Sequence, residues 1–254
     1  MDPRLRARRI EVMRRQGRRR LRFASYALAL GAAAFAIFGL TRSPLLDVDT
    51  ISVKGVERTP EGLIAEIASH LKSQPLLELD TTAVEEEIVA LPWVDHVSSN
   101  RSLDGTLTFV VTERPVVAAV AGGSGWLLVD TNGRVLERVV AVPPGVVAVD
   151  GLAWDLVAGE WVPDEALPGI EVAAAMPPGL AAAVSSVRLG GTPEVGVELV
   201  LKVGGIVVLG PTLDLNQKFV SAATILQQVP LRCLEMIDVR APTVPVLTRD
   251  PDCL

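Results

Sequence analysis

The stretch LPWVDHVSSNRSLDGTLTFVVTERPVVA, residues 91–118, predicts two neighbouring strands of a small domain. Trp93 begins an extended run and gives a small core a large apolar anchor. Between residues 106 and 112 apolar side chains alternate mainly with threonines, as on a strand with one buried face. The Asp-Gly pair at 104–105 suits a tight turn between the two strands.

The residues before this stretch predict a strand and two helices. Apolar and polar residues alternate from 46 to 53 and meet Gly55, as in a strand that ends in a turn. A threonine and a proline then begin a helix near 60–72, whose apolar residues fall on one face. A second helix, residues 82–91, begins with a capping-box pattern and stops at the next proline. The order strand, helix, helix, strand, strand therefore fills residues 46–115.

This order resembles the POTRA domain, the βααββ module of polypeptide-transport-associated proteins. In particular, it looks like the POTRA domain of the FtsQ family of bacterial division proteins, also called DivIB. The matching stretches are residues 51–56 (ISVKGV), 91–94 (LPWV) and 111–118 (VTERPVVA). Residues 102–105 depart from the family, which more often has a proline before the last strand, so the hairpin geometry stays open.

An uncharged run, residues 23–41, precedes this domain and predicts a single transmembrane helix. As a helix it would cover about 28 Å, close to the hydrocarbon thickness of a bilayer. Residues 1–22 carry ten arginines against two acidic residues, a formal charge of +8 in a chain whose total is −6. Because cytoplasmic flanks collect Lys and Arg, we expect a single-pass type II protein with this tail inside and the body translocated.

Two alternatives to the anchor stay open. The alanine-rich run could belong to a cleaved signal peptide, although it is longer than the usual apolar region of about 7–15 residues and is not followed by small residues in the needed places. The arginines could bind nucleic acid, but so close to a spanning helix anionic lipid is the simpler partner. We therefore expect the cytoplasmic membrane, and no nucleic acid, as a partner.

Residues 116–250 predict a mainly antiparallel β domain with a C-terminal helix and a last edge strand, before a short tail at 251–254. Apolar runs predict a hairpin at 126–136, consecutive strands at 186–189, 195–201 and 206–209, and a helix at 215–229. Residues 151–182 are assigned only a short helix. The hairpin turn at Asp130 and Asn132 could also be a calcium loop, but the following acidic ligand is missing.

Three further stretches resemble the C-terminal signature of the FtsQ family in its actinobacterial form: residues 209–210 (LG), 218–219 (KF) and 237–242 (IDVRAP). With the anchor and the POTRA pattern, the resemblance spans nearly the whole chain. It implies an α+β protein that acts as a bitopic scaffold of the divisome at the septum and helps couple septal assembly. It also implies FtsB/DivIC-like and FtsL-like bitopic partners, and other divisome components that bind the POTRA domain.

In the family, a partner segment adds as a strand at the C-terminal edge of the β domain. An exposed last strand suits this role, because its unpaired backbone groups can bind another chain. The resemblance places the partner contact on Lys218, Ile237, Asp238, Val239, Arg240, Val244, Val246 and Leu247. Prolines at 242 and 245 leave the register open. The alternative is a local Asp238–Arg240 ion pair with valines that belong to the core.

The two cysteines, Cys233 and Cys253, both lie in the part predicted to be translocated, where disulfides persist. A bridge between them would tie the C-terminal tail to the end of the last helix. Two free thiols are the alternative.

No catalytic or metal-binding constellation is evident in the sequence. His70 and His96 lack a metal-spaced partner or a nucleophile motif, and Glu85 to Glu87 form a charge run on a helix whose other face is apolar. The glycine-rich run 122–125 lacks the lysine of a phosphate loop. We therefore expect a binding protein without a cofactor, not an enzyme. A POTRA-containing transport or assembly factor and an anchored extracytoplasmic enzyme of unfamiliar type remain as alternatives.

Overall fold

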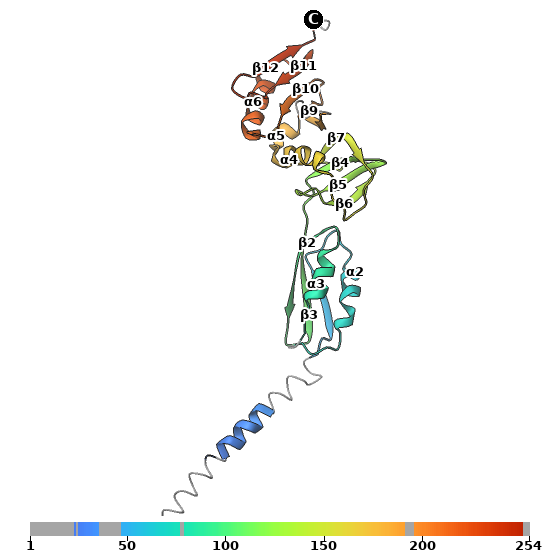
Figure 1. Cartoon of the computed structure of the whole chain (residues 1–254), viewed down its shortest axis with the longest axis vertical. Coiled ribbons are helices and arrows are strands. Elements are labelled where there is room, and N and C mark those ends of the chain that lie inside the picture. The colour runs from blue at the N-terminus through green and yellow to red at the C-terminus, as the bar shows by residue number, and fades with distance from the viewer. Residues whose placement is uncertain (1–22, 24, 36–46, 77–78, 191–195, 251–254) are drawn as a thin grey trace, which may run out of the picture. The chain divides into compact units, whose positions relative to one another are not determined.

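The computed structural model describes residues 23, 25–35, 47–76, 79–190 and 196–250 (Figure 1). The chain divides into two compact units. The first unit comprises residues 1–56, 60–86 and 97–111, and the second comprises 57–59, 87–96 and 112–254. Three short stretches that the sequence assigns to the first domain therefore belong to the second unit.

The predicted transmembrane helix, residues 23–41, lies partly outside the described residues. Phe23 and residues 25–35 are helical and exposed. Within the described part of the chain, we find no helix that is both long enough and apolar enough to cross a membrane. The arginine-rich tail, residues 1–22, lies outside the described residues.

The predicted βααββ order is confirmed. In chain order, its elements are β1 (Thr50–Lys54), α2 (Glu61–Ile67) continued by the 3-10 turn η2 (Ala68–Leu71), α3 (Thr82–Val89), β2 (Val94–Arg101) and β3 (Thr106–Glu113). The three strands form a sheet in the order β1-β3-β2, and β1 runs parallel to β3 with Ile51 opposite Leu107. Ile64 of α2, Ile88 of α3 and Phe109 of β3 are fully buried. The two helices and the sheet therefore bury apolar faces, as the sequence pattern predicts.

Both helix starts differ slightly from the prediction. Helix α2 is preceded by Pro60, at which no side chain caps the helix. The Glu113 carboxylate accepts the backbone N–H of Thr59 at 2.7 Å. At the start of α3, the Asp80 carboxylate accepts the backbone N–H of Thr82 at 3.0 Å, and the Thr81 hydroxyl donates to the Glu85 carboxylate at 2.9 Å.

The second unit is built on a nine-stranded sheet in the order β12-β11-β10-β9-β8-β7-β4-β5-β6. Its strands are β4 (Ala118–Gly122), β5 (Gly125–Val129), β6 (Val135–Val139), β7 (Val147–Trp154), β8 (Val184–Leu189), β9 (Val197–Leu201), β10 (Ile206–Gly210), β11 (Leu234–Asp238) and β12 (Val246–Arg249). The predicted consecutive strands are β8, β9 and β10, and they pair antiparallel as expected. Five of the eight strand pairings are antiparallel.

Three pairings are parallel, which the sequence did not predict: β4 with β7, β7 with β8, and β10 with β11. Parallel neighbours need a crossover connection. Two of these crossovers contain helices, since α4 (Leu167–Ala175) and α5 (Pro178–Ala181) connect β7 to β8, and α6 (Leu215–Gln228) connects β10 to β11. The short 3-10 turn η3 (Asp164–Ala166) leads into α4.

The helices of this unit pack on the sheet and against one another. Helix α4 contacts β4, β7, β8 and β9, and it also contacts α6, which packs on β10. Ile170 of α4 and Phe219 of α6 are each 1% exposed. The region 151–182, which the sequence assigned only a short helix, thus supplies the middle of this core. Prolines in the first turns of α4 and α5 suit these helix starts, where a missing N–H costs no hydrogen bond.

Candidate functional site

The C-terminal strand β12 forms one edge of the nine-stranded sheet (Figure 1). It pairs antiparallel with β11, with Leu247 opposite Ile237 and Val246 opposite Asp238. On its other side, no strand of the described residues pairs with it. An edge strand of this kind presents unpaired backbone donors and acceptors to another chain. The predicted last edge strand is therefore present.

The connection from β11 to β12 begins with an ion pair between Asp238 and Arg240. The Nη2 of Arg240 lies 2.6 Å from the Oδ2 of Asp238, and its Nε donates to both carboxylate oxygens at 3.0–3.1 Å. These side-chain bonds lower the pKa of Asp238, although burial opposes the shift. Because the Arg240 side chain is 55% exposed, its guanidinium lies at the surface of this edge. The local ion pair considered from the sequence is thus formed.

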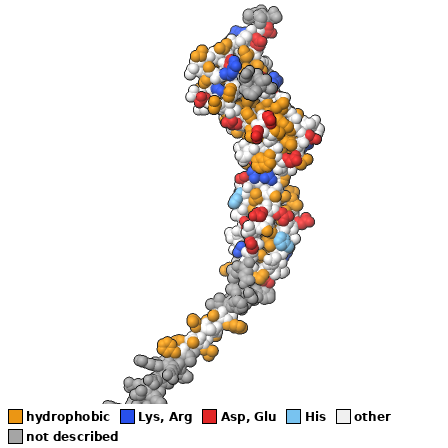
Figure 2. All heavy atoms as spheres, in the orientation of Figure 1, with side chains coloured by type: hydrophobic (Ala, Val, Ile, Leu, Met, Phe, Trp, Pro, Cys, Tyr) orange, Lys and Arg blue, Asp and Glu red, His pale blue; other side chains and the backbone are white. Residues whose placement is uncertain are grey.

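Two hollows flank this connection. One, of about 400 Å³, is lined by Asp238, Arg240, Ala241, Val244 and Val246. The other, of about 490 Å³, lies between α6 and the residues Pro242, Thr243 and Pro245. Over α6, β11 and β12, Figure 2 shows hydrophobic side chains interspersed with charged ones. The edge therefore combines unpaired backbone groups, apolar surface and two exposed arginines, Arg240 and Arg249.

The eight residues predicted to contact a partner separate into two groups. Val244 and Val246 are 71% and 55% exposed, and Asp238, Arg240 and Leu247 reach the surface at least partly. In contrast, Ile237, Val239 and Lys218 are buried. Ile237 of β11 and Val239, which follows the strand, belong to the hydrophobic core of the unit. Their side chains can support the edge but do not form its outer surface.

Lys218 is buried in the first turn of α6. It is 3% exposed, and its Nζ donates to the carbonyl oxygen of Pro211 at 2.7 Å. Burial lowers the pKa of this lysine, while the charge of Asp214 opposes the shift. Asp214 precedes α6 in the left-handed conformation, with φ +56°. The sequence placed Lys218 at the flank of a partner contact and gave no sign of its burial.

Cys233 lies just before β11 and is disulfide-bonded. Its carbonyl oxygen also accepts a hydrogen bond from the backbone N–H of Asp250 at 3.0 Å. Cys253, the other residue of the predicted bridge, lies outside the described residues. This backbone bond ties the C-terminal end of β12 to the start of β11.

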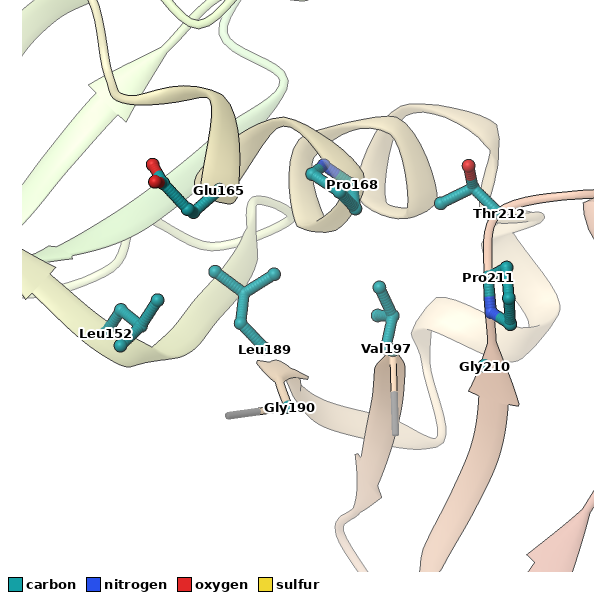
Figure 3. A pocket seen from close by; sticks show the side chains of 10 residues that line it. Leu152, Glu165, Pro168, Leu189, Gly190, Val197, Gly210, Pro211 and Thr212 are labelled. Atoms are coloured by element: carbon teal, nitrogen blue, oxygen red, sulfur yellow. The ribbon is translucent and has the colours of Figure 1, made fainter. Parts of the chain in front are cut away.

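A pocket of about 480 Å³ lies near the start of α4, where Leu189 and Gly210 end β8 and β10, and Leu152 of β7 also lines it (Figure 3). Its lining is mostly aliphatic, with Glu165 as its one carboxylate. Residues from four strands and a helix meet here, which sequence spacing alone could not indicate. The described part of the chain holds no group of three side chains arranged to bind a metal ion. We find no nucleophile with a base among the residues that line this pocket.

The turn considered as a calcium loop is filled by protein contacts. Asp130, 2% exposed, accepts backbone N–H bonds from Asn132 and Arg134 at 2.9 and 2.8 Å. Its second oxygen lies 2.9 Å from the Nη1 of Arg114, which also pairs with Asp95 at 3.1 Å. The carboxylate is therefore used to hold the turn and to neutralise Arg114, and the hairpin interpretation is correct. The role of Arg114 was missed, because its partner lies sixteen residues away.

Comparison with known proteins places this fold in context. The family model for the FtsQ-type POTRA domain matches residues 46–114. The chain is 36% identical over 109 residues to the cell division protein FtsQ of Corynebacterium glutamicum, covering 42% of this chain and 48% of that protein. It is 29% identical over 243 residues to FtsQ of Streptomyces bingchenggensis, covering 92% of this chain and 90% of that one.

Some of these matches are partial. The match spans about half the length of the Corynebacterium protein and of FtsQ from Myxococcus fulvus, at 48% and 51%. Among solved structures, the major extracytoplasmic domain of the cell division protein DivIB from Geobacillus stearothermophilus matches with a TM-score of 0.33 and 19% identity. That match covers 47% of this chain and 99% of the other, and at this score it carries no structural argument.

Proposed function

This chain belongs to the FtsQ/DivIB family of cell division proteins, and we propose that it is a non-enzymatic divisome scaffold that binds other division proteins at its C-terminal sheet edge. The observation that carries the proposal is β12, an edge strand paired on one side, with Val246 55% exposed beside the hollow that Arg240 also lines. An unpaired edge next to apolar surface is suited to strand addition.

In the proposed complex, a segment of an FtsB/DivIC-like partner pairs with the outer side of β12. Main-chain hydrogen bonds supply affinity, and side-chain contacts supply selectivity. Val244 and Val246 offer apolar contact in the hollow of about 400 Å³. The exposed guanidinium of Arg240 offers the donors that Asp238 leaves unused to a carboxylate of the partner. An FtsL-like protein joins the same assembly, and other divisome components bind the POTRA domain.

We also propose that the chain is anchored in the cytoplasmic membrane at the septum by residues 23–41. The arginine-rich tail then remains in the cytoplasm, and the POTRA domain and the β domain lie outside it. This topology is supported by the charge asymmetry across the uncharged run. It places the C-terminal edge in the compartment where the bodies of other bitopic division proteins lie.

The test is a charge placed on the edge, Val246→Asp. A carboxylate there would have to be buried without a partner when a second strand packs against β12, so we expect binding of the DivIC-like partner to weaken at least tenfold, about 1.4 kcal/mol. The measurement is recovery of that partner from crosslinked membranes, together with thermal unfolding of the variant. Because Val246 is exposed, the fold should remain unchanged.

Val203→Asp is the matched control. Val203 is 61% exposed and lies in the turn between β9 and β10 of the same sheet. The Val203→Asp variant should bind the partner as well as the parent chain does. A folded Val246→Asp variant with the same partner recovery as Val203→Asp would refute the proposed edge.

A further inference from the structure

Lys218 is the one buried lysine or arginine among the residues that the structure describes. Its position is costly for two reasons: burial removes the charge from water, which outweighs the attraction of Asp214, and the charge lies at the positive end of the α6 dipole. The carbonyl oxygen of Pro211 accepts a hydrogen bond from its Nζ. Replacing a buried charge by an apolar residue of similar volume is often neutral or stabilising. Stability alone therefore gives no reason for a lysine here.

The carbonyl that Lys218 holds belongs to the turn that ends β10. Figure 3 shows Gly210 at the end of this strand, with Pro211 next in the chain. Gly210 adopts φ +67°, and a Cβ there would lie 2.9 Å from the Cγ and 3.2 Å from the Cδ of Arg240. The aliphatic stem of Arg240 therefore crosses directly over the Gly210 backbone. Lys218 fixes the turn through the adjacent peptide.

The position of the Arg240 guanidinium depends on where the aliphatic part of its side chain lies. Its Nε and Nη2 both bond the Asp238 carboxylate, at 2.6–3.1 Å. Asp238 is the last residue of β11. The residue that follows it, Val239, donates its backbone N–H to the carbonyl oxygen of Val208 in β10 at 3.0 Å, which fixes the end of the strand. Arg240 is thus held at two points, by Asp238 at the guanidinium and by Gly210 along the stem. A displacement of the Gly210–Pro211 turn would remove the second support.

We propose that Lys218 is a positioning residue for Arg240. By holding the Pro211 carbonyl, it fixes the turn on which the Arg240 stem rests, and so sets the direction of the guanidinium at the sheet edge. The consequence for partner selection rests on the proposed function above; the positioning itself does not. Lys218 then influences the binding edge only through the position of Arg240, without contacting a partner.

The test of positioning needs no partner. In the full-length chain in detergent micelles, labelled with ¹⁵N-arginine, the Nε–Hε signal of Arg240 is identified by its loss in Arg240→Lys. Lys218→Met keeps an unbranched stem and removes the donor. We expect the Arg240 signal to shift and its Hε exchange with water to accelerate at least fivefold, while thermal stability is unchanged or higher.

Lys202→Met is the matched control, because Lys202 also donates its Nζ to a backbone carbonyl, that of Ala182 at 2.8 Å, but is exposed. It should leave the Arg240 signal unchanged. A folded Lys218→Met variant with the parent Arg240 signal and exchange rate would overturn the proposal. If Lys218→Met does not fold, Lys218→Arg keeps a charged donor with a different reach and should shift the same signal. Unfolding of both variants would mean that Lys218 holds the fold itself, which also overturns a positioning role.

Partner binding then separates this inference from the proposed function. If both hold, Lys218→Met weakens binding of the DivIC-like partner about as much as Arg240→Ala, and adding it to Arg240→Ala has no further effect. If the double variant instead loses affinity by the product of the two single losses, Lys218 acts on binding independently of Arg240. If Val246→Asp leaves binding intact, the edge proposal fails while the Arg240 signal still decides the positioning role.

Discussion

Glu113 illustrates how a single carboxylate can replace the interactions that a local sequence pattern predicts. The sequence around Thr59 predicts an N-cap, but the Glu113 oxygens accept the backbone N–H groups of Arg58 and Thr59 at 2.7–3.0 Å. Glu113 lies 54 residues away from Thr59 in the chain, so no local pattern could identify the bond.

The same carboxylate gives a pH-dependent prediction. Burial tends to raise the pKa of Glu113, but hydrogen bonds from Thr59 and Arg58 hold it below its ordinary value. Its contribution to stability is therefore fully present above the unfolded pKa of about 4.3 and is lost as the pH falls through the lower, folded pKa. We expect Glu113→Gln to lower the Tm at pH 7, and the difference from the parent chain to shrink at pH 3. The control is Glu137→Gln, at an exposed position, for which the Tm should differ little from that of the parent chain at both pH values. A Tm difference for Glu113→Gln that is the same at pH 7 and pH 3 would contradict the stabilising role of the Glu113 carboxylate.

At the scale of elements, individual strands and pairings between consecutive strands were predicted better than pairings between strands that are distant in the chain. The strands of the POTRA domain and the meander β8 to β10 follow from alternating residues such as Leu107 and Phe109. The parallel pairing of β10 with β11 does not, because it depends on α6 returning the chain to the same end of the sheet. For the same reason the sequence indicated that Ile237 lies near the edge but not that it points into the core.

Two glycines of the POTRA domain give a matched prediction. Gly55 follows β1 with φ +85°, and a Cβ there would collide with the carbonyl oxygen of Val111. Gly62 lies in α2, and a Cβ there would meet nothing within 4 Å. We expect Gly55→Ala to lower the unfolding free energy by about 2 kcal/mol and Gly62→Ala to raise it by about 0.5–1 kcal/mol. Denaturant unfolding measures both, and equal effects of the two changes would contradict the turn geometry.

For the whole molecule, the order of a POTRA domain followed by a β domain could be predicted from periodicity and turn residues, while the membrane anchor at residues 23–41 stays a prediction. The candidate site was only partly predictable. The last strand lies at the sheet edge as predicted, whereas Ile237 and Asp238 lie on β11, which pairs with both β10 and β12. The surface of Arg240 also depends on Gly210, which lies on another strand. Such a support becomes visible only when the sheet order is known. The edge is therefore a product of β10, β11, β12 and α6 together.

Hydrogen exchange of the full-length chain, with and without a purified DivIC-like partner, tests the binding edge most directly. If a partner strand adds to β12, the amides of Val246–Arg249 that face away from β11 should exchange at least tenfold more slowly in the complex. The amides of β6, at the opposite edge of the same sheet, serve as the internal control and should keep their rates. A partner that binds while the β12 amides exchange at their free rates would contradict strand addition at this edge.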